Sequence, residues 1–565
     1  MPRSLSLVPA LLFAAIVSLV ACAEPVTYDV VIRDGMIYDG SGGAPYRGDV
    51  AIDDDRIAAV GNVGRAVGTT EIDAAGLAVS PGFINMLSWA NESLIEDGLG
   101  QSDIRQGVTL EVFGEGSSMG PLSESMKEGK LESQGDIRYP IEWTTLGEYL
   151  DWLTGRGVAP NLASFVGATT VRIHVLGYED RAPTEAELDE MRALVAQATE
   201  EGALGVGSSL IYSPAYYAGT AELIALAEVA GEYGGMYISH IRGEGNRLLE
   251  NVEELITIAR EAGVPAEIYH LKASGRDNWD KLQDVIRRVE DAREEGLRIT
   301  ADMYTYHASS TGLDAVMPPW VQEGGHDAWV ERLKDPAIRE RVRVDMNDPA
   351  GEWDNTWLSA GSPDNILLTG FRTDSLRYLT GRTVADVARM RETGPEETAM
   401  DLVIQDDSRV QSVFFTMSED NIRRKIAVPW VSFCSDAGAY ATDGVFLNFQ
   451  PHPRGYGTFA RLLGMYVRDE QVIPLEEAVR RLTSFPAGNL GIRERGSLEP
   501  GHFADVVVFD PETIADRATF ERPHQYAVGV RYVFVNGEAV ISNGGPTGAK
   551  PGRVVRGPGW RGWTE

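Results

Sequence analysis

The stretch of residues 236–270, MYISHIRGEGNRLLENVEELITIAREAGVPAEIYH, decides the fold that the sequence predicts. It opens with an apolar run that ends at His240 and closes with a second apolar run that ends at His270. Between Asn246 and Gly263, apolar side chains recur three and four residues apart, which is typical of an amphipathic helix. A strand, a helix and a second strand in this order indicate parallel strands joined by a helical crossover.

The same unit recurs on both sides of this stretch. Thr184, followed by Glu187, forms a capping-box pattern at the start of one further helix. The predicted helices cover residues 184–201, 220–233, 246–263 and 277–295, and the predicted strands cover residues 204–210, 236–240, 264–270 and 298–304. Successive units of about 30 residues predict a parallel sheet, and in a chain of this length a (β/α)8 TIM-like barrel.

Both ends of the chain differ from the centre, because they contain short segments rich in Val and Ile. The strands predicted there cover residues 28–37, 48–61, 501–509 and 529–540. A small β-sandwich formed from both chain termini would explain them. We therefore expect an α/β protein in which the two parts of the sandwich are residues 26–80 and 491–560 and the barrel is residues 81–490. Prolines and tryptophan pairs between about residues 312 and 428 indicate an inserted lid.

The chain has 565 residues and a formal net charge of −33 at pH 7. Nucleic acid and anionic lipid both attract basic surfaces, so this charge argues against binding to either. An acidic, solvated surface is the ordinary interpretation. If the substrate is an anion, its site must supply a local cation.

The N-terminus is typical of an export signal. Arg3 precedes an apolar run from Leu5 to Val20, which is short for a membrane span and leads into Leu19-Val20-Ala21-Cys22. This ending resembles a bacterial lipobox, in which the cysteine is lipidated. We expect a signal peptide over residues 1–22 and a periplasmic or outer-membrane-anchored lipoprotein. The alternative is ordinary cleavage near Ala23, which would release a soluble protein.

Three side chains suited to metal chemistry follow predicted strands. His240 and His270 each end a strand, and Asp436 follows the apolar run of residues 428–433. The C-terminal ends of barrel strands converge, so these side chains are expected to meet at one face. Two imidazoles and a carboxylate can hold Zn2+ or a similar ion. The alternative for each histidine is a hydrogen-bonded residue of the core.

Several short motifs accompany these residues. They are Pro81-Gly82-Phe83-Ile84, Ile238-Ser239-His240, Tyr269-His270-Leu271-Lys272, Ser435-Asp436, Pro451-His452-Pro453-Arg454 and Gly501-His502-Phe503-Ala504-Asp505. Together they resemble the amidohydrolase superfamily, and more narrowly its N-acyl-D-amino-acid deacylase (D-aminoacylase) branch. The resemblance covers about residues 26–560 and implies a distorted barrel with a small β-sandwich.

The sequence departs from that family at two places. The family has a metal-binding His-x-His pair after the Pro-Gly-Phe-Ile strand, where this chain has Leu87 and Trp89. The family also has a cysteine ligand where this chain has Gly116. Glu115 is adjacent and can supply an anionic ligand instead, whereas Glu111 is a weaker candidate inside the strand.

These departures predict one zinc ion instead of two. Its ligands would be His240, His270 and Glu115, with water in the open position, as in catalytic zinc sites. Asp436 would be the general base for that water and is also expected to reach the metal. The alternative is a non-catalytic protein that has kept the fold.

The resemblance also implies residues that bind the substrate. Arg454 would bind the α-carboxylate of the substrate, since a guanidinium pairs bidentately with a carboxylate. Tyr304 and Tyr306 lie in a segment that lines this carboxylate site in the family, and we favour Tyr306, for which packing in the core is the alternative. Lys272 is either a substrate contact or a loop cation. Ser209 and Tyr212 would line the acyl pocket.

The expected activity is therefore metal-dependent hydrolysis of the amide bond of an N-acyl amino acid. N-acyl-D-amino acids are the family substrate, and a dipeptidase or an N-acyl-L-amino-acid hydrolase is the alternative. A periplasmic binding protein is the alternative from another functional class. The sequence contains no phosphate-binding loop and no His-Glu-x-x-His motif, which argues against those two kinds of chemistry.

Overall fold

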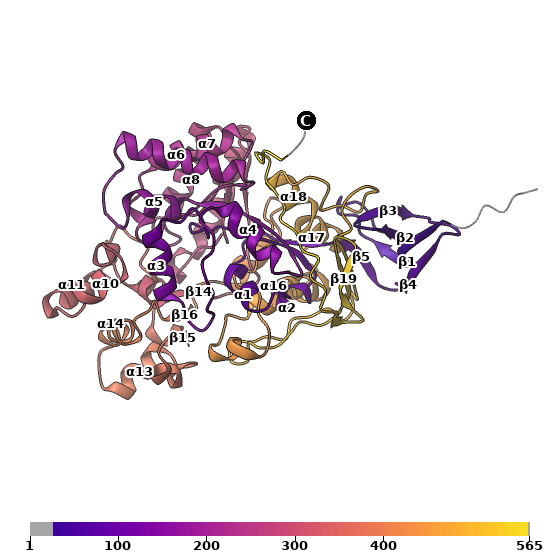
Figure 1. Ribbon diagram of the computed structural model, residues 1–565. Coiled ribbons are helices and arrows are strands. Elements are labelled where there is room, and N and C mark those ends of the chain that lie inside the picture. The colour runs from indigo at the N-terminus through magenta and orange to yellow at the C-terminus, as the bar shows by residue number, and fades with distance from the viewer. Residues whose placement is uncertain (1–25, 563–565) are drawn as a thin grey trace, which may run out of the picture.

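The computed structural model describes residues 26–562, so the predicted signal segment and Cys22 lie outside the described residues. A small β domain lies at one end of the molecule, the barrel lies in the middle and a helical insertion lies at the other end (Figure 1). Among residues 26–562, we find no helix of the length and hydrophobicity that a bilayer crossing requires.

The small β domain is one nine-stranded sheet built from both ends of the chain. The N-terminal part contributes β1 (Thr27–Ile37), β2 (Tyr46–Asp53), β3 (Arg56–Gly61), β4 (Val67–Asp73) and β5 (Ala78–Pro81), and the C-terminal part contributes β17 (Val506–Phe509), β18 (Val530–Val535), β19 (Glu538–Ser542) and β20 (Gly545–Pro546). The two parts join where β5 pairs antiparallel with β17, with Val79 opposite Val508. The predicted contribution of both termini to one β domain is confirmed.

The barrel consists of two parallel sheets. The first contains β6 (Phe83–Asn85), β7 (Val108–Phe113) and β8 (Asn161–Ser164), and the second contains β9 (Val166–Gly167), β10 (Gly205–Ser209), β11 (Met236–His240), β12 (Ala266–Ile268) and β13 (Ile299–Ala301). Only Phe165 separates β8 from β9, so these strands continue one sheet into the other.

The segment that follows α15 (Glu419–Ile426) closes the barrel. Val431 bridges to Ala301, and Ala437 bridges to Ser88, both in parallel. This segment therefore takes the place of the eighth strand, although only isolated bridges form where the sequence predicted a strand over residues 428–433. The predicted (β/α)8 architecture is confirmed.

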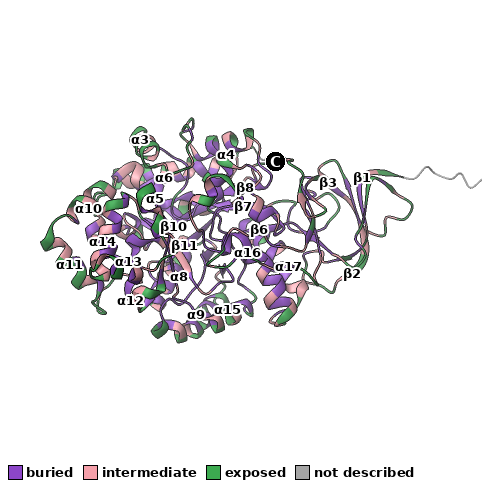
Figure 2. Ribbon diagram, turned by 90° about the horizontal axis from the view of Figure 1, so that it is seen from below, coloured by how far each residue is buried: buried purple, intermediate pink, exposed green. Residues whose placement is uncertain are grey.

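Helices surround the barrel, with buried faces turned inward and exposed faces turned outward (Figure 2). They are α1 (Ala90–Glu96), α2 (Gln101–Ile104), α3 (Glu124–Ser133), α4 (Leu146–Gly155), α5 (Ala168–Leu176), α6 (Glu185–Glu200), α7 (Thr220–Glu232), α8 (Leu248–Ala262), α9 (Leu282–Glu294), α15 (Glu419–Ile426), α16 (Arg454–Arg461), α17 (Leu475–Leu482) and α18 (Ser484–Leu490). In α8, Leu248, Val252 and Leu255 are at most 1% exposed. Burial of each such side chain contributes about 1.5–3 kcal/mol.

The insertion has its own hydrophobic core, which draws on residues between Leu313 and Phe414. Its elements are β14 (Ser309–Gly312), β15 (Ile366–Gly370) and β16 (Gln411–Phe414), with α10 (His326–Arg332), α11 (Pro336–Met346), α12 (Thr356–Ala360), α13 (Val384–Arg391) and α14 (Pro395–Asp406). By contrast, Ile422 and Ile426 of α15 pack in the barrel core. The insertion therefore ends before α15, whereas the sequence prediction extended it to about residue 428.

Glu267 of β12 is a carboxyl group inside the barrel. Thr300 donates a hydrogen bond to it from its hydroxyl group, and Asn489 donates a second one of 3.4 Å. Burial, together with the neighbouring Asp302, raises the pKa of Glu267 to about 8. The folded protein thus keeps a proton on this group at pH values where the unfolded chain has lost it.

Glu267→Gln should remove one pH-dependent contribution to stability. Between the unfolded pKa of 4.5 and the folded pKa of about 8, the wild type loses stability as the pH rises, because only the unfolded chain releases the proton. The free energy of unfolding of the variant, minus that of the wild type, should therefore increase by on the order of a few kcal/mol as the pH rises from about 5 to about 9. Urea unfolding curves measure this difference, with the exposed Glu290→Gln as control. Parallel pH dependences of Glu267→Gln and the wild type would contradict the prediction.

Candidate metal centre

His240 and His270 meet at the C-terminal face of the barrel. His240 is the last residue of β11, and His270 lies two residues beyond β12. Their ring centroids are 4.4 Å apart, and the rings are nearly perpendicular. His270 has a left-handed backbone with a φ of 33°, and its N–H donates to Asp302 over 2.7 Å. This hydrogen bond fixes the turn that directs the imidazole toward His240.

Glu115 completes a buried cluster with the two histidines. It follows β7, and its Oε1 lies 2.9 Å from His240 Nδ1 and 2.9 Å from His270 Nε2. The three ligand atoms lie within 4.8 Å of one another. Ligand atoms in a tetrahedral zinc site are about 3.4 Å apart, so the cluster would hold an ion after opening by a few tenths of an ångström. Two imidazoles and one carboxylate fit a catalytic zinc ion.

Close backbone packing explains why the anionic ligand comes from position 115. Gly116 has a φ of 67°, and a Cβ on this residue would lie 2.5 Å from the Cβ of Ser209. A side chain at position 116 therefore cannot be accommodated without movement of β10. The carboxylate of the preceding residue reaches the histidines instead.

Trp89 and Leu87 occupy the positions of the missing histidine pair. Leu87 is buried in the barrel core. Trp89 Nε1 donates to Glu115 Oε2 over 3.0 Å, which leaves the other oxygen of Glu115 to face the histidines. In the part of the chain that the structure describes, Glu115, His240 and His270 form the one cluster with metal-binding geometry.

Glu244 faces the outer nitrogens of both rings. Its Oε1 is 3.2 Å from His270 Nδ1 and 3.7 Å from His240 Nε2. The same oxygen is 2.6 Å from Lys272 Nζ. Carboxylates in this position orient ligating histidines and fix their tautomers. The sequence analysis missed this residue, because its one signal is a position in the loop four residues after His240.

The charges of the cluster are strongly coupled. Burial and Lys272 oppose the charged form of His270, but Glu115 and Asp436 outweigh them and raise its pKa to about 9. Burial lowers the pKa of His240. Burial also opposes the charged form of Glu115, but the two histidines hold its pKa well below the usual range.

Asp436 lies beside the cluster and outside its ligand set. Its backbone has a φ of 49°, and its Oδ2 is 2.6 Å from Arg454 Nη1. The prediction that Asp436 also reaches the metal is therefore not supported by the geometry, because this carboxylate turns to Arg454. Burial raises the pKa of Asp436, whereas Arg454 and His270 oppose that rise.

Hydrogen bonds to Asn85 of β6 fix the loop that carries Asp436. Ser435 N donates to Asn85 Oδ1 over 2.8 Å. Asn85 Nδ2 in turn donates to Glu111 over 2.9 Å. Glu111 is fully buried and takes part in this network. It was the weaker of the two acidic ligands considered in the sequence analysis, and it does not belong to the metal cluster.

The two predicted tyrosines differ in orientation. Tyr304 is buried beneath the guanidinium of Arg454, which lies 4.5 Å above its ring, and its hydroxyl has no hydrogen-bond partner among residues 26–562. The hydroxyl of Tyr306 donates to Asp516 over 2.9 Å and so points away from the cluster. The contact with Arg454 favours Tyr304 over the preferred Tyr306, but neither tyrosine lines the cavity that contains the metal cluster, so a substrate contact by either residue stays a prediction.

One cavity of about 950 Å³ joins these residues. Glu115, His240, His270, Asp436 and Arg454 line it, as do the predicted Lys272, Tyr212 and Ser209. Arg409 and Trp329 of the insertion border the same cavity, in agreement with the lid position that the sequence predicted.

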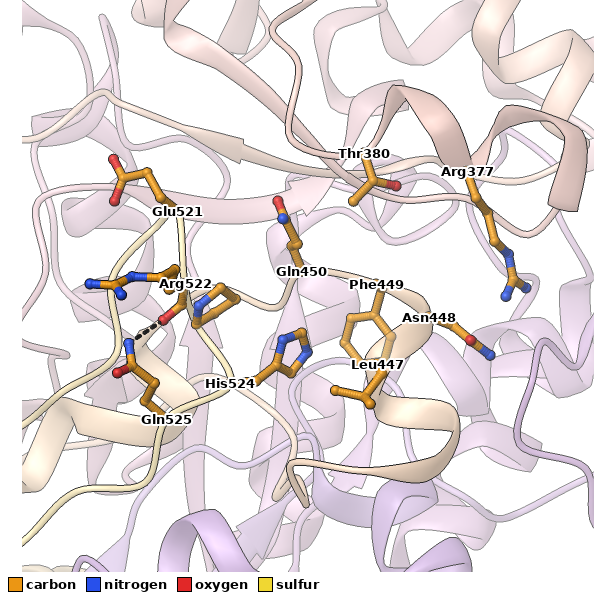
Figure 3. A pocket seen from close by; sticks show the side chains of 11 residues that line it. Arg377, Thr380, Leu447, Asn448, Phe449, Gln450, Glu521, Arg522, His524 and Gln525 are labelled. Carbon is orange, nitrogen blue, oxygen red and sulfur yellow. Dashed lines mark hydrogen bonds between the residues drawn. The ribbon is translucent and has the colours of Figure 1, made fainter.

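A second cavity of about 710 Å³ lies behind the loop of Asn448 and Phe449, which line both cavities. Figure 3 shows Gln450, Phe449 and His524 around it. His524 Nε2 lies 2.9 Å from the Phe446 carbonyl oxygen, so this imidazole supports the loop. The metal cluster contributes nothing to this second cavity.

Comparisons with known proteins agree with the fold and the site. A family model described as "Amidohydrolase family" matches residues 134–541. The chain belongs to the amidohydrolase family. It is 32% identical to a D-aminoacylase of Alcaligenes xylosoxydans xylosoxydans over 94% of this chain and 97% of that protein. It is 31% identical to an N-acyl-D-aspartate deacylase of the same organism, with coverage of 94% and 95%. The predicted D-aminoacylase branch is thus confirmed.

A solved structure of a similar protein holds a metal. The N-acyl-D-glutamate deacylase of Bordetella bronchiseptica, in complex with zinc and a phosphonate inhibitor, has a TM-score of 0.77 and 31% identity, covering 94% of this chain and all of that one. A D-aminoacylase structure has the same TM-score and 32% identity, with the same coverage. The amidohydrolases of this branch are metal-dependent, which fits the donor set of Glu115, His240 and His270.

Glu244→Gln should weaken zinc binding by about 10- to 100-fold, because the amide no longer offers a charged acceptor to the two imidazoles. Competition with a chromophoric chelator measures the affinity. Glu250→Gln on α8 is the matched control, since Glu250 is exposed and pairs with Arg247. Equal zinc affinity in the two variants would exclude this role for Glu244.

Proposed function

We propose that the protein is a zinc-dependent hydrolase that cleaves the amide bond of N-acyl-D-amino acids. The observation that carries the proposal is the cluster of Glu115, His240 and His270 in the same cavity as Asp436 and Arg454. The names of the relatives support the acyl-amino-acid class and the D configuration, because all three at 30–32% identity are D-aminoacylases or N-acyl-D-amino-acid deacylases.

Each polar residue of the cavity has a role in this reaction. A divalent ion bound by the cluster would lower the pKa of a bound water and polarise the scissile carbonyl. Asp436 accepts the proton of the attacking water and then delivers it to the leaving nitrogen. Arg454 binds the free carboxylate of the substrate, which places the amide bond near Asp436.

The Arg454–Asp436 pair prepares both residues for these roles. The guanidinium stabilises the charged form of Asp436, which a general base needs. Arg454 is buried, and its Nε has no hydrogen-bond partner among the described residues. The Nε–H group can therefore donate a hydrogen bond to an oxygen of the substrate carboxylate while Nη1 stays with Asp436.

A single ion is proposed because the second set of ligands is missing. Leu87 and Trp89 have no imidazole to offer, and Trp89 uses one oxygen of Glu115. Gly116 has no side chain, and its surroundings leave no room for one. The remaining donors suffice for one ion with an open position for water.

Asp436→Asn should retain one zinc per chain and lower kcat by about 10²- to 10⁴-fold, since the amide cannot accept the proton of the water. His270→Ala should lose the zinc. Elemental analysis and turnover of N-acetyl-D-amino acids, their L counterparts and dipeptides measure both outcomes.

Two ions per chain in the wild type would refute the single site. Zinc binding without any turnover would support a binding protein, and faster turnover of L substrates or dipeptides would replace the D assignment.

We further propose that the protein is exported and lipidated at Cys22, on the basis of the Leu-Val-Ala-Cys sequence. The described chain starts in the small β domain, at the end opposite the insertion (Figure 1). A lipid at Cys22 would thus hold this domain next to the membrane. Cys22→Ser should move the protein from the membrane fraction to the soluble periplasmic fraction. A wild-type protein found only in the soluble fraction would contradict the anchor.

A further inference from the structure

The charges around the metal cluster limit the charge of the substrate. Five buried charged side chains surround the two histidines in the cavity. They are Glu115, Glu244, Lys272, Asp436 and Arg454, and we call these five residues the cavity floor. Three are carboxylates and two are cations, so these five side chains carry one net negative charge, and the histidines add none when they are neutral, as metal binding requires. A divalent ion changes this to one net positive charge. A single substrate carboxylate neutralises it.

Both cations of the floor already have partners. Lys272 Nζ is 2.6 Å from Glu244 Oε1, and Arg454 Nη1 is 2.6 Å from Asp436 Oδ2. One further anion can share the guanidinium of Arg454. A second carboxylate in the floor would have no cation left to compensate it, and an uncompensated buried charge is strongly unfavourable.

Of the cations in the wall above the floor, Arg409 and Arg372 already have carboxylate partners, Asp314 and Asp407, whereas Lys130 of α3 also lines this cavity. Arg409 Nε is 2.8 Å from Asp314 Oδ2 and 3.0 Å from Asp314 Oδ1. On the wall next to Glu244, the carboxylate of Asp354 accepts the N–H groups of Glu244 and Gly245, each over 3.1 Å. This wall therefore adds negative charge and repels an acidic side chain.

We infer that the enzyme takes N-acyl amino acids with uncharged side chains and discriminates against N-acyl aspartate and N-acyl glutamate. This inference rests on the proposed function for the acyl-amino-acid class. The comparisons do not decide it, because an aminoacylase and two acidic-substrate deacylases are 30–32% identical to this chain. The charge balance of the cavity decides between them.

N-acetyl-D-glutamine and N-acetyl-D-glutamate are a matched test pair, because they differ mainly in the charge of the side chain. The kcat/KM of the zinc-loaded wild type should be at least about tenfold higher for the glutamine substrate. Calorimetry with the products D-glutamine and D-glutamate should show the same preference in binding. Equal or better use of the glutamate substrate would overturn the inference.

Asp314→Asn tests the physical cause, because it releases Arg409 next to the cavity. Arg409 lies 4.8 Å from the ring of Tyr212, which in turn lies 5.5 Å from the His240 ring. The variant should shift the glutamine-to-glutamate ratio toward glutamate by about tenfold, and Arg409→Gln in the same background should reverse the shift. An unchanged ratio would exclude the charge of this wall as the cause.

The two proposals fail in different ways. If neither substrate is hydrolysed but D-glutamine binds more tightly than D-glutamate, the hydrolase proposal fails and the charge argument stands. If both substrates are hydrolysed at equal rates, the hydrolase proposal stands and the charge argument fails.

Discussion

The approach of Glu115 to His240 and His270 is the contact on which the rest of the site depends. Glu115 is separated from His240 by 125 positions and from His270 by 155, and each of the three lies at or just beyond the end of a different strand of the barrel. The closed ring of parallel strands brings these ends together at one face. Val431 and Ala437 close this ring, and Asp436 lies between them. Formation of the barrel therefore also brings Asp436, the proposed general base, to the site.

Periodicity predicted the strand–helix units that contain β10 to β13, because their helices are amphipathic, but it did not predict β6 to β9. The strand ending at His240 forms as predicted. The C-terminal boundary of the insertion could not be predicted from the sequence. Ile422 and Ile426 have helical spacing, but spacing shows only that a face is buried and not which of two cores covers it.

The predicted site depended on residue type and strand position, and its errors arose where the chain leaves regular structure. Tyr304 and Tyr306 follow β13, which ends at Ala301. Beyond that point no strand alternation relates the two rings, so the sequence could not show that one faces Arg454 and the other Asp516. Glu244 lies in a loop, where the pattern of charges alone does not reveal a contact with two histidines.

The departures from the family depend on one another. The tight contact of Gly116 with Ser209 excludes a side chain there, so the anion comes from Glu115. The second oxygen of that buried carboxylate needs a donor, and the indole of Trp89 provides it. Histidines at positions 87 and 89 would remove this donor. The substitutions thus form one arrangement, in which the proposed single divalent ion and the five charges of the cavity floor would leave one positive charge for the substrate.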